Sequence, residues 1–193
     1  MKNITVFCGS SSGFRVEYTE AAVNLAHCLA ERNIRLIYGG GNVGLMGIIA
    51  DEVMRLGGEV IGIIPHSLNK KEVGHRGITE LRVVGSMHER KALMAELTDG
   101  FIAMPGGIGT FEEFFEILTW AQLGFHGKPC GILNVAGYYD ALLALCDNAV
   151  SEGFLRDVHR QLILDETDSI LLLDKMLNFQ PQAIEKWIDE TDL

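Results

Sequence analysis

The chain has 193 residues, of which 48% are hydrophobic and 22% are charged, as expected for one globular domain. A domain of this length buries about 70% of its unfolded surface, so it does not depend on disulfides or a structural metal. The formal net charge of -10 argues against a general affinity for nucleic acid, so an anionic ligand must be small and locally held.

Nothing in the cysteines or the amino terminus indicates secretion. The cysteines are far apart, form no CxxC pair and have no histidine at ligand spacing, which argues against a disulfide framework and against zinc. The initial apolar run is too short for a signal peptide, and no later run approaches the roughly 18 residues of a membrane span. We therefore expect a cytoplasmic protein that binds no membrane and no metal. The residues expected to be small and buried are Cys8, Cys28, Cys130 and Cys146.

Short runs rich in Val, Ile and Phe alternate with longer segments of helical periodicity. This order predicts a parallel sheet with helices on both faces. No repeat or linker divides the chain, so we expect a single Rossmann-like, doubly wound α/β domain over residues 1–193. The predicted strands are 4–8, 34–38, 60–64, 80–84, 100–104 and 130–133. The predicted helices are 16–32, 45–56, 88–97, 111–123, 138–152 and 169–176.

Glycine-rich segments follow three of these strands and precede helices. In doubly wound sheets ligands bind at this position, beyond the carboxyl ends of the strands. Glycine also serves many turns that bind nothing, so tight turns alone remain the alternative interpretation. The segments are CGSSSG at 8–13, GGGNVGLMG at 39–47 and PGGIGTFEE at 105–113.

The second segment contains a GxGxxG match at Gly39, Gly41 and Gly44, after a strand and before a helix. A dinucleotide site also needs an acidic residue at the end of the next strand, whereas Glu59 lies at the start of its strand. Neither this loop nor 105–109 ends in Gly-Lys-Ser/Thr, which excludes a P-loop. Two loops with bare backbone amides at helix starts favour one compact phosphate and its sugar.

Two charged residues fall on apolar helix faces. Glu113 follows Thr110 in a T-x-x-E pattern, so one interpretation is a capping box. It also shares a helix face with Ile117, which directs its carboxylate inward. Arg90 precedes Leu93, Met94 and Leu97 at helical spacing, so its buried charge needs a ligand phosphate or a carboxylate, unless it reaches solvent or pairs with a structural acid.

The remaining polar residues near these positions have simpler interpretations. Glu89 forms a second capping box with Ser86, and Lys91 is either a solvated lysine or a second phosphate contact. The helix 111–123 is apolar nearly all round, which predicts a homodimer with this helix near the interface. Its one polar stripe, which we expect to border the ligand, consists of Glu112, Glu116 and Thr119.

With SMHERK at 86–91 and PGGIGTFEE at 105–113, the chain resembles the LONELY GUY (LOG) family of cytokinin-activating phosphoribohydrolases. The resemblance runs from Phe7 to about Phe154. It implies hydrolysis of the N-glycosidic bond of a nucleoside 5′-monophosphate, with release of an adenine-type base and ribose 5-phosphate and no metal or redox cofactor. Some relatives carry the label lysine decarboxylase, but no internal lysine here has the context of a pyridoxal phosphate site.

The resemblance also implies roles for particular residues. Glu113 stabilises the oxocarbenium-like ribose or activates water. Arg90 is the second catalytic residue and orients the ligand and Glu113, since its pKa makes it a poor acid. The implied substrate contacts are Gly41, Gly44, Glu72, Lys91, Gly106, Gly107, Ile108, Gly109, Thr110, Phe111, Glu112 and Thr119.

Two alternatives remain open at this point. The same loops could serve a nucleotide-sensing module without turnover, although the presence of both Arg90 and Glu113 favours an enzyme. The enzyme could also be a general AMP nucleosidase without a role in cytokinin metabolism. An N6 substituent changes only the pocket lining, so the sequence does not separate these substrates.

Overall fold

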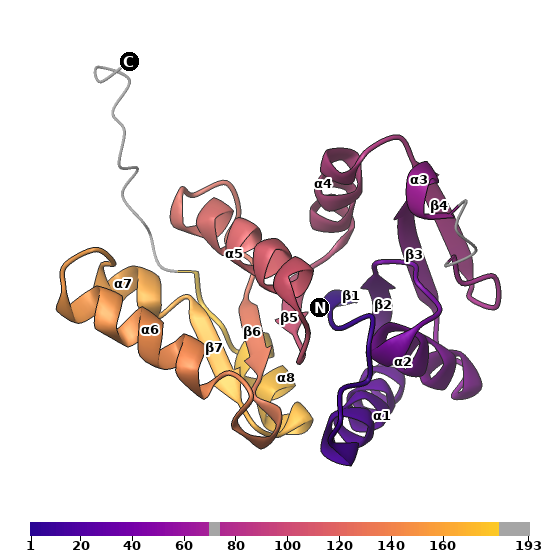
Figure 1. Cartoon of the computed structure of the whole chain (residues 1–193), viewed down its shortest axis with the longest axis horizontal. Coiled ribbons are helices and arrows are strands. Elements are labelled where there is room, and N and C mark those ends of the chain that lie inside the picture. The colour runs from indigo at the N-terminus through magenta and orange to yellow at the C-terminus, as the bar shows by residue number, and fades with distance from the viewer. Residues whose placement is uncertain (70–73, 182–193) are drawn as a thin grey trace.

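The computed structural model describes residues 1–69 and 74–181. Within them, seven strands form one parallel sheet in the order β4-β3-β2-β1-β5-β6-β7, which confirms the predicted α/β class (Figure 1). The central strand β1 lies between β2 and β5, so the strand order reverses there and leaves a crevice at the carboxyl ends. The strands are β1 (Asn3–Phe7), β2 (Arg35–Tyr38), β3 (Val60–Pro65), β4 (Glu80–Val84), β5 (Gly100–Ala103), β6 (Cys130–Leu133) and β7 (Ile163–Glu166).

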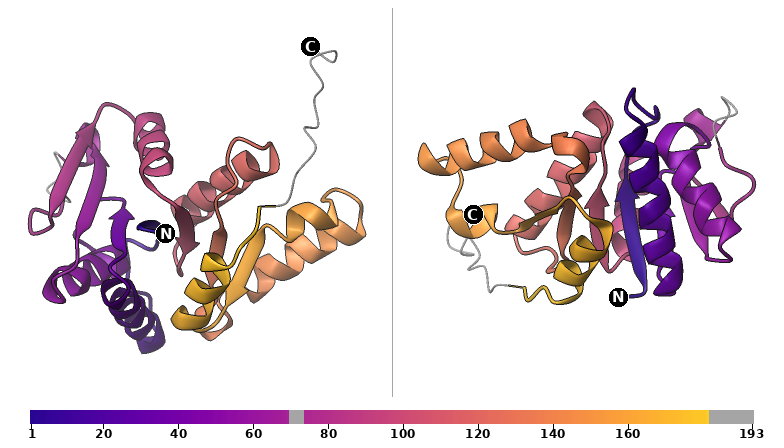
Figure 2. Two further views of the ribbon diagram at one scale, coloured as in Figure 1. Left: turned by 180° about the vertical axis from the view of Figure 1, so that it is seen from behind. Right: turned by 90° about the horizontal axis from the view of Figure 1, so that it is seen from below.

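The helices cover both faces of the sheet (Figures 1 and 2). One face packs against α1 (Val16–Glu31), α2 (Gly44–Arg55) and α8 (Ser169–Leu177). The other packs against α4 (Met87–Leu97), α5 (Ile108–Gln122) and α6 (Asp140–Ser151). Short elements complete the connections: α3 (His66–Asn69), η1 (Val135–Gly137) and α7 (Asp157–Arg160). Among the helices of the described residues, none is both long and apolar enough to cross a membrane.

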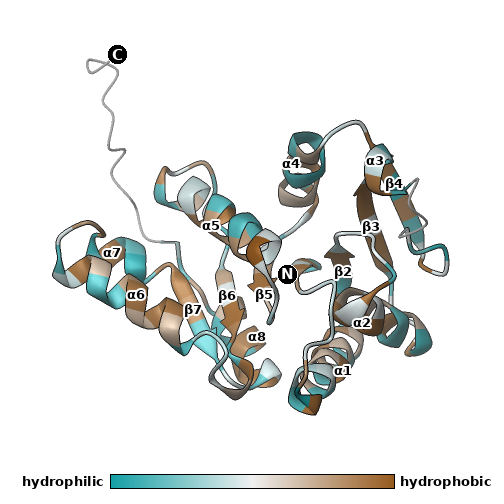
Figure 3. Cartoon of the chain, in the orientation of Figure 1, coloured by the Kyte–Doolittle hydropathy of each residue, from teal (hydrophilic) through white to brown (hydrophobic). Residues whose placement is uncertain are grey.

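The strands are apolar because the sheet is covered on both sides. Leu36 and Tyr38 belong to the core beneath α1 and α2, whereas Ile37 between them belongs to the opposite core. Alternate side chains of a strand point to opposite faces, so both faces must be hydrophobic here. The hydropathy colouring shows the same pattern, with brown central strands and helices banded in brown and teal (Figure 3). All four cysteines are buried and free, as predicted.

All the predicted strands and helices are present, with shifted ends, but some elements were not predicted. Strand β7 has the sequence ILDE at the sheet edge, where only its first residue is buried, so it lacks the apolar run of the central strands. The short helices α3 and α7 have too few residues to show a period. Helix α5 begins at Ile108, three residues before its predicted start, and this shift changes the interpretation of Glu113.

Candidate active site

The glycine-rich segments meet at the carboxyl edge of the sheet. The backbone N–H of Gly9, after β1, donates to the carbonyl of Pro105, after β5, over 3.0 Å. The N–H of Leu45, in the first turn of α2, donates to the carbonyl of Gly9 over 3.1 Å. The loop after β1 therefore joins the two loops that the sequence singled out, and all three form one surface.

Glycine is required at two points of this surface because backbones approach closely. Gly44 has a φ of +57°, and a Cβ there would lie 2.3 Å from the carbonyl carbon of Ser10. At Gly106, a Cβ would lie 2.9 Å from the backbone nitrogen of Gly9 and 2.2 Å from the hydroxyl of Thr110. Only a residue without a side chain fits such positions.

These loops line a cleft of ≈ 330 Å³. Tyr18 and Tyr138 form one wall and contact each other edge to face, with ring centroids 5.8 Å apart. The Tyr138 hydroxyl donates to the carbonyl of Gly106. Helix α5 starts beside the cleft after Gly107, which offers no side-chain cap, so the N–H groups of its first turn have no side-chain partner. A helix start of this kind attracts an anion such as phosphate.

The two charged residues predicted to lie on apolar faces form a buried ion pair between α4 and α5. Arg90 Nη1 lies 2.8 Å from Glu113 Oε1, and the two residues are 8% and 9% exposed. Arg90 Nε also donates to the carbonyl of Ile63 at the end of β3, over 3.0 Å. Burial raises the pKa of Glu113 above its ordinary value, and the adjacent Arg90 opposes that shift. Glu113 is thus a fixed carboxyl group whose proton affinity suits acid–base work.

The capping-box interpretation of Glu113 is wrong. The cap residue of α5 is Gly107, so Thr110 already lies in the first turn and Glu113 lies beyond it. The second predicted capping box is formed in part. Ser86, the cap residue of α4, accepts from the N–H of Glu89, but the Glu89 carboxylate accepts from the N–H of Gly85, one residue before the cap.

Lys91 contacts carboxylates of α5. Its Nζ lies 2.6 Å from Glu112 Oε1 and 2.9 Å from Glu116 Oε2, and its side chain is 9% exposed. Burial disfavours its charge, but the hydrogen bonds to Glu112 and Glu116 outweigh this and raise the pKa of Lys91. Lys91 is therefore not a solvated lysine, and its role as a phosphate contact stays a prediction.

Three further predicted contacts lie in the first turn of α5, namely Ile108, Thr110 and Phe111. Thr110 is buried beneath Gly106, and Phe111 packs edge to face on Tyr139 with ring centroids 6.1 Å apart. Ile108 is 80% exposed at the start of α5, next to Gly107 and Gly109.

Two predicted contacts are less closely joined to this arrangement, and a third lies outside the described residues. Thr119 is exposed further along α5, and its hydroxyl donates to the carbonyl of Phe115. Gly41 forms an isolated bridge with Gly74, which ties the loop after β2 to the segment before β4. Glu72 lies outside the described residues.

The sequence analysis assigned no site residue to the segment after β1, although it recognised the CGSSSG pattern. Ser10, Ser11 and Ser12 line the cleft with Tyr138, which lies far away in sequence. The glycine spacing of 8–13 was the sequence signal that could have indicated a site here. The spacing does not reveal the sheet order, however, and only the pairing of β1 with β5 brings this loop to 105–107.

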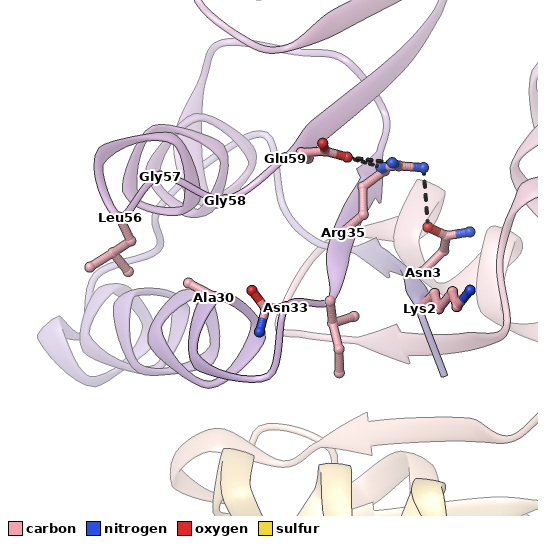
Figure 4. A pocket seen from close by; sticks show the side chains of 10 residues that line it. Lys2, Asn3, Ala30, Asn33, Arg35, Leu56, Gly57, Gly58 and Glu59 are labelled. Atoms are coloured by element: carbon pink, nitrogen blue, oxygen red, sulfur yellow. Dashed lines mark hydrogen bonds and ion pairs between the residues drawn. The ribbon is translucent and has the colours of Figure 1, made fainter.

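A larger cavity, of ≈ 530 Å³, lies at the opposite edge of the sheet (Figure 4). It is lined by the amino ends of strands and includes Arg35, whose Nε donates to Glu59 Oε2 over 2.6 Å. Glu59 thus lies at the amino edge and pairs with an arginine, which confirms that it does not complete a dinucleotide site. No cluster of His, Cys, Asp or Glu suited to a metal ion occurs within residues 1–69 and 74–181.

Comparison with known proteins places this arrangement in context. A family model described as "Possible lysine decarboxylase" matches residues 46–176. A probable cytokinin riboside 5′-monophosphate phosphoribohydrolase of Oryza sativa subsp. japonica is 52% identical over 180 residues, which cover 93% of this chain and 79% of the relative. A cytokinin riboside 5′-monophosphate phosphoribohydrolase of Arabidopsis thaliana is 50% identical over 181 residues, covering 94% and 85%.

Solved structures share the fold at lower identity. The molybdenum cofactor binding protein of Rippkaea orientalis superposes with a TM-score of 0.69 at 19% identity, over 92% of this chain and 98% of that one. The molybdenum cofactor carrier protein of Chlamydomonas reinhardtii gives 0.68 at 19% identity, over 91% and 98%. At this identity the likeness establishes the fold alone.

Proposed function

This chain belongs to the LONELY GUY (LOG) family of cytokinin riboside 5′-monophosphate phosphoribohydrolases, and from that premise we propose how its residues act. It is a hydrolase of N-glycosidic bonds that releases a free base and ribose 5-phosphate from an N6-substituted adenosine 5′-monophosphate. The observation that carries the proposal is the buried Arg90–Glu113 pair, which lies on helices at the same sheet edge as the glycine loops.

The phosphate is held at the start of α5. Gly106, Gly107, Gly109 and Thr110 offer backbone amides without side chains in the way, and the positive helix end favours the dianion. Glu113 lies further along the same helix. We assign the ribose attached to a phosphate at the helix start to the side of this carboxylate. The Ser10–Ser12 segment and Tyr138 form the opposite wall of the cleft.

Cleavage moves electrons from the sugar to the base. The C1′–N bond breaks with its electron pair leaving on the base, which takes a proton from solvent, and the ribose becomes positively charged. The Glu113 carboxylate stabilises that charge and accepts a proton from water as the C1′–O bond forms. Glu113 later returns to solvent the proton that it accepts from the attacking water. Arg90 holds the carboxylate in place through its 2.8 Å contact.

The pH dependence of kcat tests the role of Glu113. Its carboxylate must be ionised, so activity is present above its pKa and falls as the pH decreases through it. Because burial raises the pKa of Glu113, the acid limb is expected at a higher pH than for an ordinary glutamate. Arg90 lowers this pKa, so Arg90→Met should move the limb further up, besides reducing the rate. The test is to measure kcat from acidic to neutral pH. If activity fell only at the pH where an exposed glutamate titrates, the catalytic role of Glu113 would be contradicted.

Incubation of the purified protein with AMP and with isopentenyladenosine monophosphate tests the proposed function. Chromatography of free base and ribose 5-phosphate is expected to show release from the N6-substituted nucleotide. Equal or faster release from AMP would favour a general AMP nucleosidase, and tight binding without release would indicate a nucleotide-binding module.

We also propose a homodimer, formed through the outer side of α5. Phe114 and Ile117 of this helix are buried in the core, whereas Phe115 and Leu123 are 37% and 39% exposed and Phe125, just beyond it, is 75% exposed. An apolar surface of this kind is typical of a shared interface.

Light scattering at micromolar concentration is expected to give the mass of a dimer. Phe115→Glu should shift that mass toward the monomer, because it places a charge in the interface. Leu171→Glu is the control, since Leu171 is 56% exposed and belongs to α8, which covers the opposite face of the sheet. A monomeric unmodified protein would contradict the proposal.

The proposed compartment is the cytoplasm. All four cysteines are free and buried, which fits a reducing environment. Cell fractionation of the tagged protein tests this assignment.

A further inference from the structure

Gly39, the first residue after β2, lies against the guanidinium of Arg90. A Cβ built at this position would lie 2.2 Å from Arg90 Nη2 and 3.3 Å from its Cζ. The next nearest atom, Met46 Sδ, is at 3.3 Å, a separation that a flexible side chain can relieve. What a side chain at position 39 meets first is therefore the charged end of Arg90.

Backbone conformation does not explain the glycine at this position. Gly40 and Gly44 have φ values of +74° and +57°, in the region that disfavours residues with a side chain, but Gly39 does not. Its main chain would therefore accept alanine without strain. The severest obstacle to that substitution is the space already taken by Arg90, at 2.2 Å, compared with 3.3 Å for Met46 Sδ.

The guanidinium has little freedom to move out of the way. Its Nε is bound to the carbonyl of Ile63 over 3.0 Å and its Nη1 to Glu113 over 2.8 Å, and the residue is 8% exposed. A shift away from position 39 must lengthen at least one of these contacts. In a buried setting each lost contact leaves a charge or a carbonyl without its partner.

We propose that Gly39 is a positioning residue for the hydrolysis. Because it has no side chain, the Arg90 guanidinium can lie directly against its Cα and is held there in contact with Glu113 and with the carbonyl of Ile63. The catalytic part of this inference rests on the proposed function. The three atoms nearest to a Cβ at position 39 belong to Arg90 and Met46, and none belongs to the loops 9–13 and 105–110. A side chain at position 39 therefore displaces the catalytic pair and leaves the groups that hold the nucleotide in place.

Steady-state kinetics of Gly39→Ala test the inference. A misplacement of about 1 Å at a catalytic group costs about a hundredfold in rate, so kcat is expected to fall by roughly that factor while KM changes little. The matched control is Gly85→Ala, just before α4, where the added Cβ meets only the end of the exposed Glu89 carboxylate, at 3.1 Å. An unchanged kcat in Gly39→Ala, or a rise in KM alone, would overturn the inference.

A second measurement does not depend on activity. Gly39→Ala is made in the unmodified chain and in Arg90→Ala, where the space beside position 39 is empty. The melting temperature is expected to fall in the first background and to stay level or rise in the second, since the two sites are coupled only through the guanidinium. An equal fall in both would show that another neighbour is the obstacle, which would overturn the inference. If the unmodified protein released no base, the proposed function would fail, and this comparison would still decide whether Gly39 seats Arg90.

Discussion

Glu113→Gln is expected to lower kcat by about 10²–10⁴-fold, the usual contribution of a positioned acid–base group. In the proposed mechanism, the amide lacks the charge that stabilises the ribose cation and the site that accepts the proton from water. Its carbonyl can still accept a hydrogen bond from Arg90, and the glycine loops are untouched, so the fold and the binding of the phosphate should persist.

The comparison that makes this result specific uses Glu96→Gln on α4. Glu96 is exposed and lies outside the site, so its loss removes one negative charge from the same region without touching the reaction. Base release is measured with isopentenyladenosine monophosphate, and circular dichroism checks the fold. A Glu113→Gln variant that turned over at the unmodified rate would leave the carboxylate without a catalytic role.

Gly44→Ala should have the second largest effect, on stability and activity together. The added Cβ would lie 2.3 Å from the carbonyl carbon of Ser10 and 2.4 Å from the nitrogen of Ser11, and backbone atoms cannot move aside cheaply. The φ of +57° adds strain. We expect a loss of at least ~3 kcal/mol in the free energy of unfolding, with separation of the loops that hold the phosphate.

Gly57→Ala is the control that separates the cost of backbone strain in Gly44→Ala from the cost of steric overlap. Gly57 has a φ of +80°, but a Cβ there meets nothing within 4 Å. It should cost only the left-handed backbone penalty of roughly 1–2 kcal/mol and leave kcat/KM unchanged. Urea unfolding of both variants gives the comparison. Equal losses would mean that the contact between the loop after β1 and the start of α2 contributes nothing.

Much of the fold could be predicted from the sequence because the central strands are buried on both faces. Such strands are runs of Val, Ile and Phe, and their ends coincide with the glycine-rich segments. Strand β7 was not predicted because it lies at the sheet edge, where Asp165 and Glu166 are only half-buried and the strand needs no apolar run. The start of α5 was predicted too late in the chain. Gly107 caps the helix without a side chain, so the nearby T-x-x-E pattern indicated Thr110 as the cap residue instead.

The sequence predicted where the site residues lie on each helix, but it did not predict the contacts between helices. Periodicity placed Arg90 and Glu113 on apolar faces and required an anionic partner for Arg90, and the burial of both residues confirms that placement. That each is the partner of the other depends on how α4 packs beside α5, which no local pattern encodes. The role of Gly39 was hidden for the same reason, since its neighbour Arg90 comes from a helix on the other side of β3 and β4 in the chain.

Strand β1 pairs with β5, so Val6 lies beside Ile102 although nearly half of the chain separates them. During synthesis β2 can pair with one side of β1 early, but the other side stays open until β5 is made. The cleft likewise lacks the loop 105–107 until that segment has been synthesised. Glu113 emerges later still. A nascent or prematurely terminated chain that stops before α5 consequently cannot hydrolyse the nucleotides around it, and cleavage begins only in chains that have passed this point.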